Sequence, residues 1–176
     1  MTEPFIYEAL PGRVVFGAGR RREVAAESEL LGHNVFFISD ALVMTTADEI
    51  ATALGDRLAQ RWHEVVQHVP YELAERARAA IDASHPDVVV TIGGGSSTGL
   101  AKAIALSHGL PILAVPTTYA GSEMTPIYGL TGDRHKQTGK NLAVLPRTVI
   151  YDPELTLGLP PSVTGPSAFN ALAHCV

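Results

Sequence analysis

The residues with the clearest chemical potential lie in segment 88–105, which reads VVVTIGGGSSTGLAKAIA. A run of β-branched residues gives way to three glycines and two serines, and a pattern of small and apolar residues follows. This order predicts a buried strand, a tight glycine turn and the N-terminus of a helix. Glycines let the backbone approach a phosphate, and free N–H groups at a helix start point toward it. The segment predicts a phosphate site; the alternative is a strand-to-helix turn without a ligand.

An acidic side chain follows another predicted strand. Asp40 comes directly after NVFFIS (34–39), an apolar run typical of a buried strand. In dinucleotide-binding folds, a carboxylate at such a strand end accepts hydrogen bonds from the adenosine ribose and repels a 2′-phosphate. Asp40 is therefore a candidate cofactor residue that favours NAD over NADP, with a turn or helix-capping role as the alternative. Because Asp40 precedes the glycine turn instead of following it, the pattern argues against a conventional dinucleotide fold.

Hydroxyl side chains cluster directly after a third predicted strand, in PTTYAGSEMT (116–125). The candidates for hydrogen bonds to cofactor phosphates, ribose or carboxamide are Thr117, Thr118, Ser122 and Thr125. The alternative is a polar loop that bonds its own backbone. Further along, Lys140 follows a hairpin that we predict around residues 132–133. Its charge could neutralise a cofactor phosphate, or it could be a solvated surface lysine, as most lysines are.

Near the end of the chain, Asn170 and His174 are four residues apart in a helical pattern, so they share one helix face. A carboxylate at that spacing from a histidine would be a plausible half of a metal site, but an asparagine amide is a poorer ligand. We therefore expect no metal here. His174 is a candidate hydrogen-bond or proton donor, and a purely structural histidine is the alternative.

Alternating strands and helices would position these side chains. Strands are predicted at 13–16, 34–39, 64–69, 87–92, 111–115 and 148–151, and helices at 20–31, 46–60, 72–84, 97–108 and 167–176. Thr46 and Glu49 have capping-box spacing, and 152–166 is predicted to be a proline-rich connector. This alternation predicts βαβ units on a parallel sheet. Ligands of such sheets bind beyond the carboxyl ends of the strands, so Asp40, Gly93 and Pro116 should face one crevice.

The composition is that of a globular protein, with 46% hydrophobic and 18% charged residues in 176. A net charge of −5 gives no general attraction to nucleic acid or to an anionic membrane. The single cysteine, Cys175, excludes an internal disulfide and fits a reducing compartment. We find no signal peptide and no apolar run long enough to span a membrane, and we therefore expect a cytoplasmic protein. The last predicted helix has no stop signal, which predicts an N-terminal portion of a longer polypeptide.

Three motifs together resemble the iron-containing alcohol dehydrogenase superfamily, and among its branches the maleylacetate reductases. They are GGGSSTGLAKAIAL (93–106), PTTYAGSEMT (116–125) and YDPELTLGLPPSVTGPSAFNALAH (151–174). The resemblance covers nearly all of the chain. It implies an α/β fold with a parallel-sheet dinucleotide-binding domain of the dehydroquinate synthase-like type, normally followed by a helical domain. Residues 1–160 would form the first domain, and 161–176 a connector and the first helix of the second.

The chain departs from the metal-dependent members in three places. They carry Asp where this chain has Gly99, and their metal-binding Asp falls at Asn170. We call segment 116–125 the threonine loop; in the metal-dependent members this loop is one residue longer, around the position of Tyr119. Their first metal-binding histidine falls at His174. The resemblance to the maleylacetate reductase branch, whose members work without a metal, accounts for all three departures.

The resemblance also implies roles for individual residues. Gly94, Gly95 and Ser96 would hold the cofactor pyrophosphate. Asp40 would contact the adenosine ribose, Lys140 the ribose side of the cofactor, and the four hydroxyl residues would line it. Tyr119, Asn170 and His174 would face the substrate, with the last two as catalytic residues.

The implied reaction is the reduction of the carbon–carbon double bond of maleylacetate, a dicarboxylate, to 3-oxoadipate in bacterial breakdown of aromatic and chloroaromatic compounds. NADH is the expected cofactor, with NADPH as the alternative. A homodimer is expected. Two other functions stay open: a metal-dependent alcohol dehydrogenase, and an isolated nucleotide-binding module without catalysis, because a cleft enzyme cut in half lacks one wall.

Overall fold

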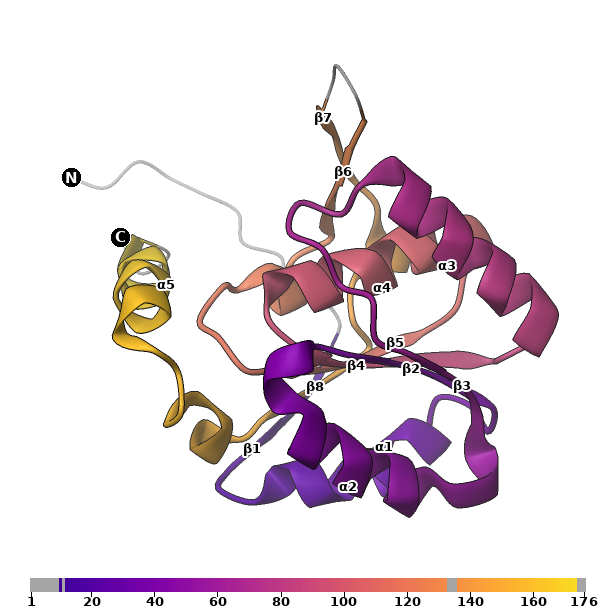
Figure 1. Ribbon diagram of the computed structural model, residues 1–176, viewed down its shortest axis with the longest axis horizontal. Coiled ribbons are helices and arrows are strands. Elements are labelled where there is room, and N and C mark those ends of the chain that lie inside the picture. Colours follow the sequence, from indigo (N-terminus) through magenta and orange to yellow (C-terminus); the bar gives the residue numbers. More distant parts are fainter. Residues whose placement is uncertain (1–9, 11, 133–135, 174–176) are drawn as a thin grey trace.

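A six-stranded parallel sheet is the centre of the computed structural model, which describes residues 10, 12–132 and 136–173 (Figure 1). The strand order is β1-β8-β5-β4-β2-β3, and every neighbouring pair runs parallel. The strands are β1 (Arg13–Phe16), β2 (Val35–Ser39), β3 (Leu58–Trp62), β4 (Val88–Gly93), β5 (Ile112–Pro116) and β8 (Thr148–Tyr151). A separate antiparallel hairpin pairs β6 (Ile127–Thr131) with β7 (Lys136–Lys140). The parallel α/β fold that the sequence predicts is confirmed.

Helices cover both faces of this sheet (Figure 1). On one face, α3 (Tyr71–Ser84) and α4 (Gly95–His108) pack over Phe36 and Val89. On the other, α1 (Val24–Glu29) and α2 (Met44–Leu54) pack over residues that alternate with those, such as Phe37 and Val90. Because successive strand residues point to opposite faces, β2, β4 and β5 are buried along their whole length and read as continuous apolar runs.

Short 3₁₀ helices and one further α-helix complete the described chain. The 3₁₀ helices are η1 (Arg20–Glu23), η2 (Ala41–Val43), η3 (Gly55–Arg57), η4 (Ser122–Met124), η5 (Leu142–Val144) and η6 (Pro153–Thr156). Helix α5 (Pro161–Ala173) stands apart from the two layers, at the left in Figure 1. Of the helices in the described ranges, none combines the length and apolar character that a bilayer span requires.

Two predictions about the middle of the chain are wrong. Helix α2 does not continue to residue 60 but ends at Leu54, because Gly55 turns the chain with φ of 54° and ψ of −130°. The strand predicted at 64–69 lies instead at Leu58–Trp62. Strand β3 is a half-exposed edge strand, so its sequence, LAQRW, lacks the apolar run that would predict a strand. Residues 64–69 cannot form a strand, because His68 and Val69 have positive φ angles.

Helix starts also differ from the prediction. Thr46 lies inside α2, which begins at Met44, so the predicted capping box is not its N-cap. Helix α4 begins at Gly95 instead of residue 97, with Gly94 as its N-cap, so the third glycine is the first residue of the helix. Helix α5 begins at Pro161, inside the predicted connector. It includes Pro166 at its sixth position, where the ring nitrogen cannot donate the intrahelical hydrogen bond to the carbonyl of residue 162.

Three strand ends meet at Gly93, as the sequence predicts. The Asp40 N–H, just after β2, donates to the carbonyl of Ile92 (3.1 Å), and the Thr117 N–H, just after β5, donates to the carbonyl of Gly93 (3.0 Å). Gly93 has φ of 147°, and a Cβ there would overlap Ser97 Oγ and lie 2.8 Å from Asp40 Cβ. Only glycine lets the three segments approach so closely.

Gly93→Ala should therefore destabilise the fold by about 3 kcal/mol, the sum of backbone strain and overpacking. Gly109→Ala is the matched control, since Gly109 also has a positive φ of 67° but no atom within 4 Å of an added Cβ. That control should cost only about 1 kcal/mol. Urea unfolding of both variants measures the difference, and equal losses would contradict a steric role for Gly93.

Candidate functional site

A cavity of about 340 Å³ lies along the first half of α4, and we call it the glycine cavity. One face of α4 forms its floor through Gly95, Ser96, Gly99 and Lys102. The walls come from Gln67, His68, Val69, Ser122, Ile127, Tyr128 and Gly129. The cavity therefore joins the predicted phosphate turn to the threonine loop and to the β6–β7 hairpin.

The glycine turn packs closely against the threonine loop. A Cβ on Gly94 would lie 3.3 Å from Thr118, and one on Gly95 would lie 3.3 Å from Ala120. Ser97, in the first turn of α4, is wholly buried, and its hydroxyl has no hydrogen-bond partner among the described residues. Backbone N–H groups at the start of α4, where the helix dipole is positive, suit an anion. The predicted site residues Gly94, Gly95 and Ser96 thus lie together at one helix start.

Asp40 lies on the opposite side of Gly93 from the threonine loop. One carboxylate oxygen accepts from the Leu42 N–H (3.0 Å) and caps η2, so the capping role predicted as an alternative is present. Its Cβ is next to the Gly93 backbone, at the edge where parallel-sheet ligands bind. The contact to a ribose stays a prediction.

Gly99, the position that departs from the metal-dependent pattern, packs against residues 66–70, which we call the strap. A Cβ on Gly99 would lie only 2.9 Å from Val69 Cγ2. Val69 is buried with φ of 45°, and His68 before it has φ of 65°. Thr131 holds this strained pair, since its N–H donates to Val69 O (3.0 Å) and its hydroxyl to His68 O (2.8 Å). A side chain at position 99 would displace the strap and with it His68.

Lys102 is the main residue that the sequence analysis missed. Its side chain is wholly buried, and Nζ donates to the carbonyls of Ser122 (2.6 Å), Thr125 (2.8 Å) and Ile127 (2.7 Å). Burial lowers the pKa of Lys102 to about 8, although the nearby Glu123 carboxylate acts in the opposite direction. The helical periodicity of α4 places this lysine on an otherwise apolar face, which is a signal of a buried charge. The sequence does not indicate which groups accept its hydrogen bonds.

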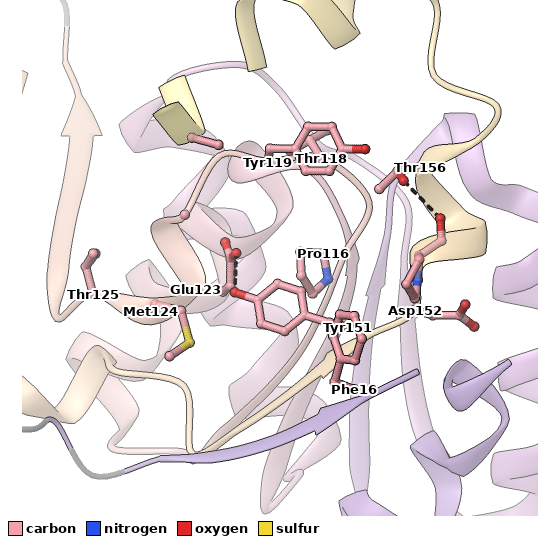
Figure 2. Close-up of a pocket in the computed structure, with 13 residues that line it drawn as sticks. Phe16, Pro116, Thr118, Tyr119, Glu123, Met124, Thr125, Tyr151, Asp152 and Thr156 are labelled. Atoms are coloured by element: carbon pink, nitrogen blue, oxygen red, sulfur yellow. Dashed lines mark hydrogen bonds between the residues drawn. The ribbon is translucent and has the colours of Figure 1, made fainter. Parts of the chain in front are cut away.

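The threonine loop separates the glycine cavity from a larger hollow. Thr118, Tyr119 and Thr125 line an apolar cavity of about 650 Å³, which reaches Phe16, Met124, Tyr151 and Ala171 (Figure 2). Ser122 instead lines the glycine cavity, and Thr117 is buried. The Thr125 hydroxyl donates to Ser122 O (3.2 Å), as the backbone-bonding alternative predicts. The four predicted hydroxyls thus do not converge on one cavity.

A tyrosine–carboxylate pair lies deep in the apolar cavity. The Tyr151 hydroxyl donates to Glu123 Oε1 (2.7 Å), as Figure 2 shows. Burial and then the Glu123 carboxylate raise the pKa of Tyr151 far above its ordinary value. The hydroxyl therefore stays protonated and keeps Glu123, itself buried, paired.

Asp152 ties the end of β8 to the turn after β1. Its carboxylate accepts from the backbone N–H groups of Gly19 (3.1 Å) and Glu154 (3.1 Å) and from the Arg21 guanidinium (2.7 Å). Burial alone would raise the pKa of Asp152, but these hydrogen bonds outweigh it and lower the pKa. The GAG sequence at 17–19 is thus a structural turn, and Gly19 has a positive φ of 76°.

Helix α5 contacts the threonine loop through two polar side chains, which we call the latch. Ser167 Oγ accepts from the Tyr119 N–H (2.8 Å), and Asn170 Nδ2 donates to Ala120 O (3.0 Å). One face of α5 thus accepts a hydrogen bond from the backbone N–H of one loop residue and donates a hydrogen bond to the carbonyl of the next. His174, the predicted partner of Asn170, lies outside the described residues.

Lys140 is exposed on β7, directly opposite Ile127 of β6. It is not among the residues that line the glycine cavity, although Ile127 is. The predicted contact of Lys140 with a cofactor therefore stays a prediction.

Comparisons with known proteins point in one direction. Residues 11–153 match the family model described as iron-containing alcohol dehydrogenase. A maleylacetate reductase of Burkholderia cepacia is 52% identical, over 97% of this chain and 49% of the relative. The solved structure of a putative alcohol dehydrogenase from Ralstonia eutropha JMP134 has a TM-score of 0.94 at 51% identity, covering 98% of this chain and 49% of that one. For a maleylacetate reductase from Agrobacterium tumefaciens, the TM-score is 0.92 at 43% identity, covering 98% and 50%. The chain spans about half the length of the curated relatives it matches.

Asn170→Asp should open the latch, because a carboxylate cannot donate to Ala120 O and is repelled by it. With the loss of roughly 1 kcal/mol, the Tyr119 N–H should exchange with solvent about fivefold faster or more. Ser167→Ala should have the same effect, whereas Ser162→Ala, an exposed position in the first turn of α5, should have none. Unchanged exchange at Tyr119 in both latch variants would contradict the contact.

Proposed function

The chain belongs to the iron-containing alcohol dehydrogenase family, and from that premise we propose that it is the nucleotide-binding portion of a maleylacetate reductase. The reaction would be the NADH-dependent reduction of the carbon–carbon double bond of maleylacetate to 3-oxoadipate. Identity of 52% and 43% to proteins named maleylacetate reductase, over nearly the whole chain, is the observation that carries the proposal. Identity of 51% to a putative alcohol dehydrogenase makes that activity the second candidate.

The residues of the glycine turn fit a dinucleotide. Gly94, Gly95 and Ser96 would hold its pyrophosphate at the N-terminus of α4, and the position of Gly95 and Ser96 on the lining of the glycine cavity supports this assignment. Asp40 would orient the adenosine ribose and disfavour a 2′-phosphate, which supports NADH over NADPH. When bound, NADH supplies the hydride.

The described residues do not fit the iron that the family is named for. Asn170 stands where metal-dependent relatives carry the metal-binding aspartate, and its amide nitrogen is directed at Ala120 O instead of at a cation. We therefore propose a metal-independent reductase, in contrast to the name of the family.

The substrate requires groups that the chain supplies only in part. Reduction of a double bond conjugated to a carbonyl builds negative charge on the carbonyl oxygen, and hydrogen-bond donors stabilise that charge. His174 is the candidate donor that this chain contributes, with Tyr119 and Asn170 on the substrate side. A dicarboxylate also needs cationic partners, which a longer polypeptide would provide. The expected homodimer, cytoplasmic location and domain boundary at residue 160 belong to the same proposal.

The test is an NADH-oxidation assay with maleylacetate and with simple aldehydes, before and after chelator treatment. We expect kcat/KM for maleylacetate to exceed that for aldehydes at least about 100-fold, because a site built for polar substrate groups rejects analogues without them. We also expect no effect of chelator. Preference for aldehydes, or activity lost to chelator and restored by iron, would favour the alcohol dehydrogenase.

The same assay applies to the 176-residue chain and to a longer polypeptide that contains it. For residues 1–176 alone, we expect weak NADH binding and negligible turnover. Binding without turnover even in a longer polypeptide would favour a nucleotide-binding module.

A further inference from the structure

We propose that Lys102 is a positioning residue for the cofactor: its buried ammonium group fixes the loop 122–127 as a wall of the glycine cavity, and cofactor affinity depends on its positive charge. This inference rests on the proposed function, because the cofactor is the NADH whose pyrophosphate is proposed to lie at Gly95 and Ser96, two residues that line that cavity. Lys102 would act through the loop and would not itself donate to the cofactor.

The geometry accounts for all three protons of the ammonium group. Nζ lies 2.6–2.8 Å from the carbonyls of Ser122, Thr125 and Ile127, with the Thr125 hydroxyl farther away at 3.3 Å. These carbonyls belong to η4, to the turn after it and to the start of β6. One side chain of α4 therefore holds three consecutive pieces of the chain in place.

The carbonyl arrangement needs a cation. Three carbonyl dipoles that point at one atom repel each other, and a charge-assisted hydrogen bond is about twice as strong as a neutral one. A neutral amine has only two N–H donors, so one carbonyl would then face a lone pair. Deprotonation of Lys102 would thus weaken the contacts that hold the loop, while the buried side chain would still fill its place in the core.

The loop faces the cofactor cavity directly. Ser122 and Ile127 line the glycine cavity together with Gly95 and Ser96, and Lys102 forms part of its floor. A shift of the loop would change the space between the phosphate turn and the hairpin. NADH affinity is therefore the quantity that should respond.

Other charged and titratable groups surround Lys102, and their contributions must be separated from its own. The loop and hairpin side of α4 presents Glu123 from η4 and Tyr128 from β6, with Lys140 on the paired strand β7. The other elements packed on α4 present Glu75 and Arg78 from α3 and His68 from the strap. Strands β2, β4 and β5 and helix η5 contribute none. A Lys102 variant retains all of these groups, so a pH effect that disappears in it belongs to Lys102.

Stability and affinity should respond to alkaline pH in opposite ways. Because the pKa of Lys102 is lowered to about 8 in the fold, the unfolded chain binds more protons between that pH and the ordinary lysine pKa. Across this window, the contribution of Lys102 to the free energy of unfolding rises with pH. The loop contacts weaken over the same range. A lysine with a purely structural role would change the free energy of unfolding with pH but leave the NADH affinity unchanged.

The experiment measures the dissociation constant of NADH by fluorescence titration from pH 6.5 to 9.5, in wild type, Lys102→Met, Lys102→Arg and Arg76→Met. In wild type, affinity should fall about tenfold as the pH rises through 8 to 9. Lys102→Met should bind at least about tenfold more weakly at pH 7 and show no such pH dependence, and Lys102→Arg should recover part of the affinity. Arg76→Met removes an exposed charge from α3 and should match wild type.

Amide exchange of residues 122–127 gives a second readout that needs no ligand. Relative to the intrinsic exchange rate at each pH, protection of these amides should fall in Lys102→Met at pH 7 and in wild type at pH 9.5, while amides of the central strand β4 keep theirs. Wild-type affinity in Lys102→Met, or a pH dependence that persists in it, would overturn the inference and leave the proposed function intact. The titrations use a longer polypeptide that contains this chain, and failure of its wild-type form to bind NADH would contradict the proposed function and, with it, this inference.

Discussion

The close approach of three strand ends at Gly93 is the constraint on which the rest of the site depends. Strand β4 is central in the sheet, with β2 and β5 as its neighbours, so the residues after all three strands meet at one point. A glycine with φ of 147° lets Asp40 and Ser97 lie against its backbone, and its carbonyl receives the Thr117 N–H. Without that close packing, the phosphate turn, the acidic residue and the threonine loop would not share an edge.

The strands that define this edge could be predicted because burial on both faces demands continuous apolar runs, and β2, β4 and β5 have them. Strand β3 could not, since an edge strand that is half exposed needs no such run, and LAQRW looks like the end of a helix. The apolar residues at 65, 66 and 69 suggested a strand instead. Val69 is indeed buried, but in a strained turn that Thr131 holds from a distant part of the chain.

The strand, glycine turn and helix start of the candidate site could be predicted from the sequence, whereas the contacts that support the loops around them could not. Glycines between a strand and a helix indicate a tight turn, because their backbone freedom is a property of the residue type itself. The partners of Lys102 are backbone carbonyls 20 to 25 residues away, and those of Asn170 lie 50 and 51 residues away. Carbonyl groups leave no mark on the sequence, because every residue has one. Only the three-dimensional structure shows that these side chains donate hydrogen bonds to backbone carbonyls in and just after the threonine loop.

These supports give the departures from the metal-dependent pattern a physical meaning. The threonine loop is held from one side by the Lys102 ammonium and from the other by Ser167 and Asn170 on α5. Gly99, one turn before Lys102, leaves room for Val69, and Asn170 donates where an aspartate could only accept. Both departures therefore replace a carboxylate by a packing or donor contact. The contacts that hold the threonine loop in this chain thus use no carboxylate at position 99 or 170, and an aspartate at position 170 alone would open the latch.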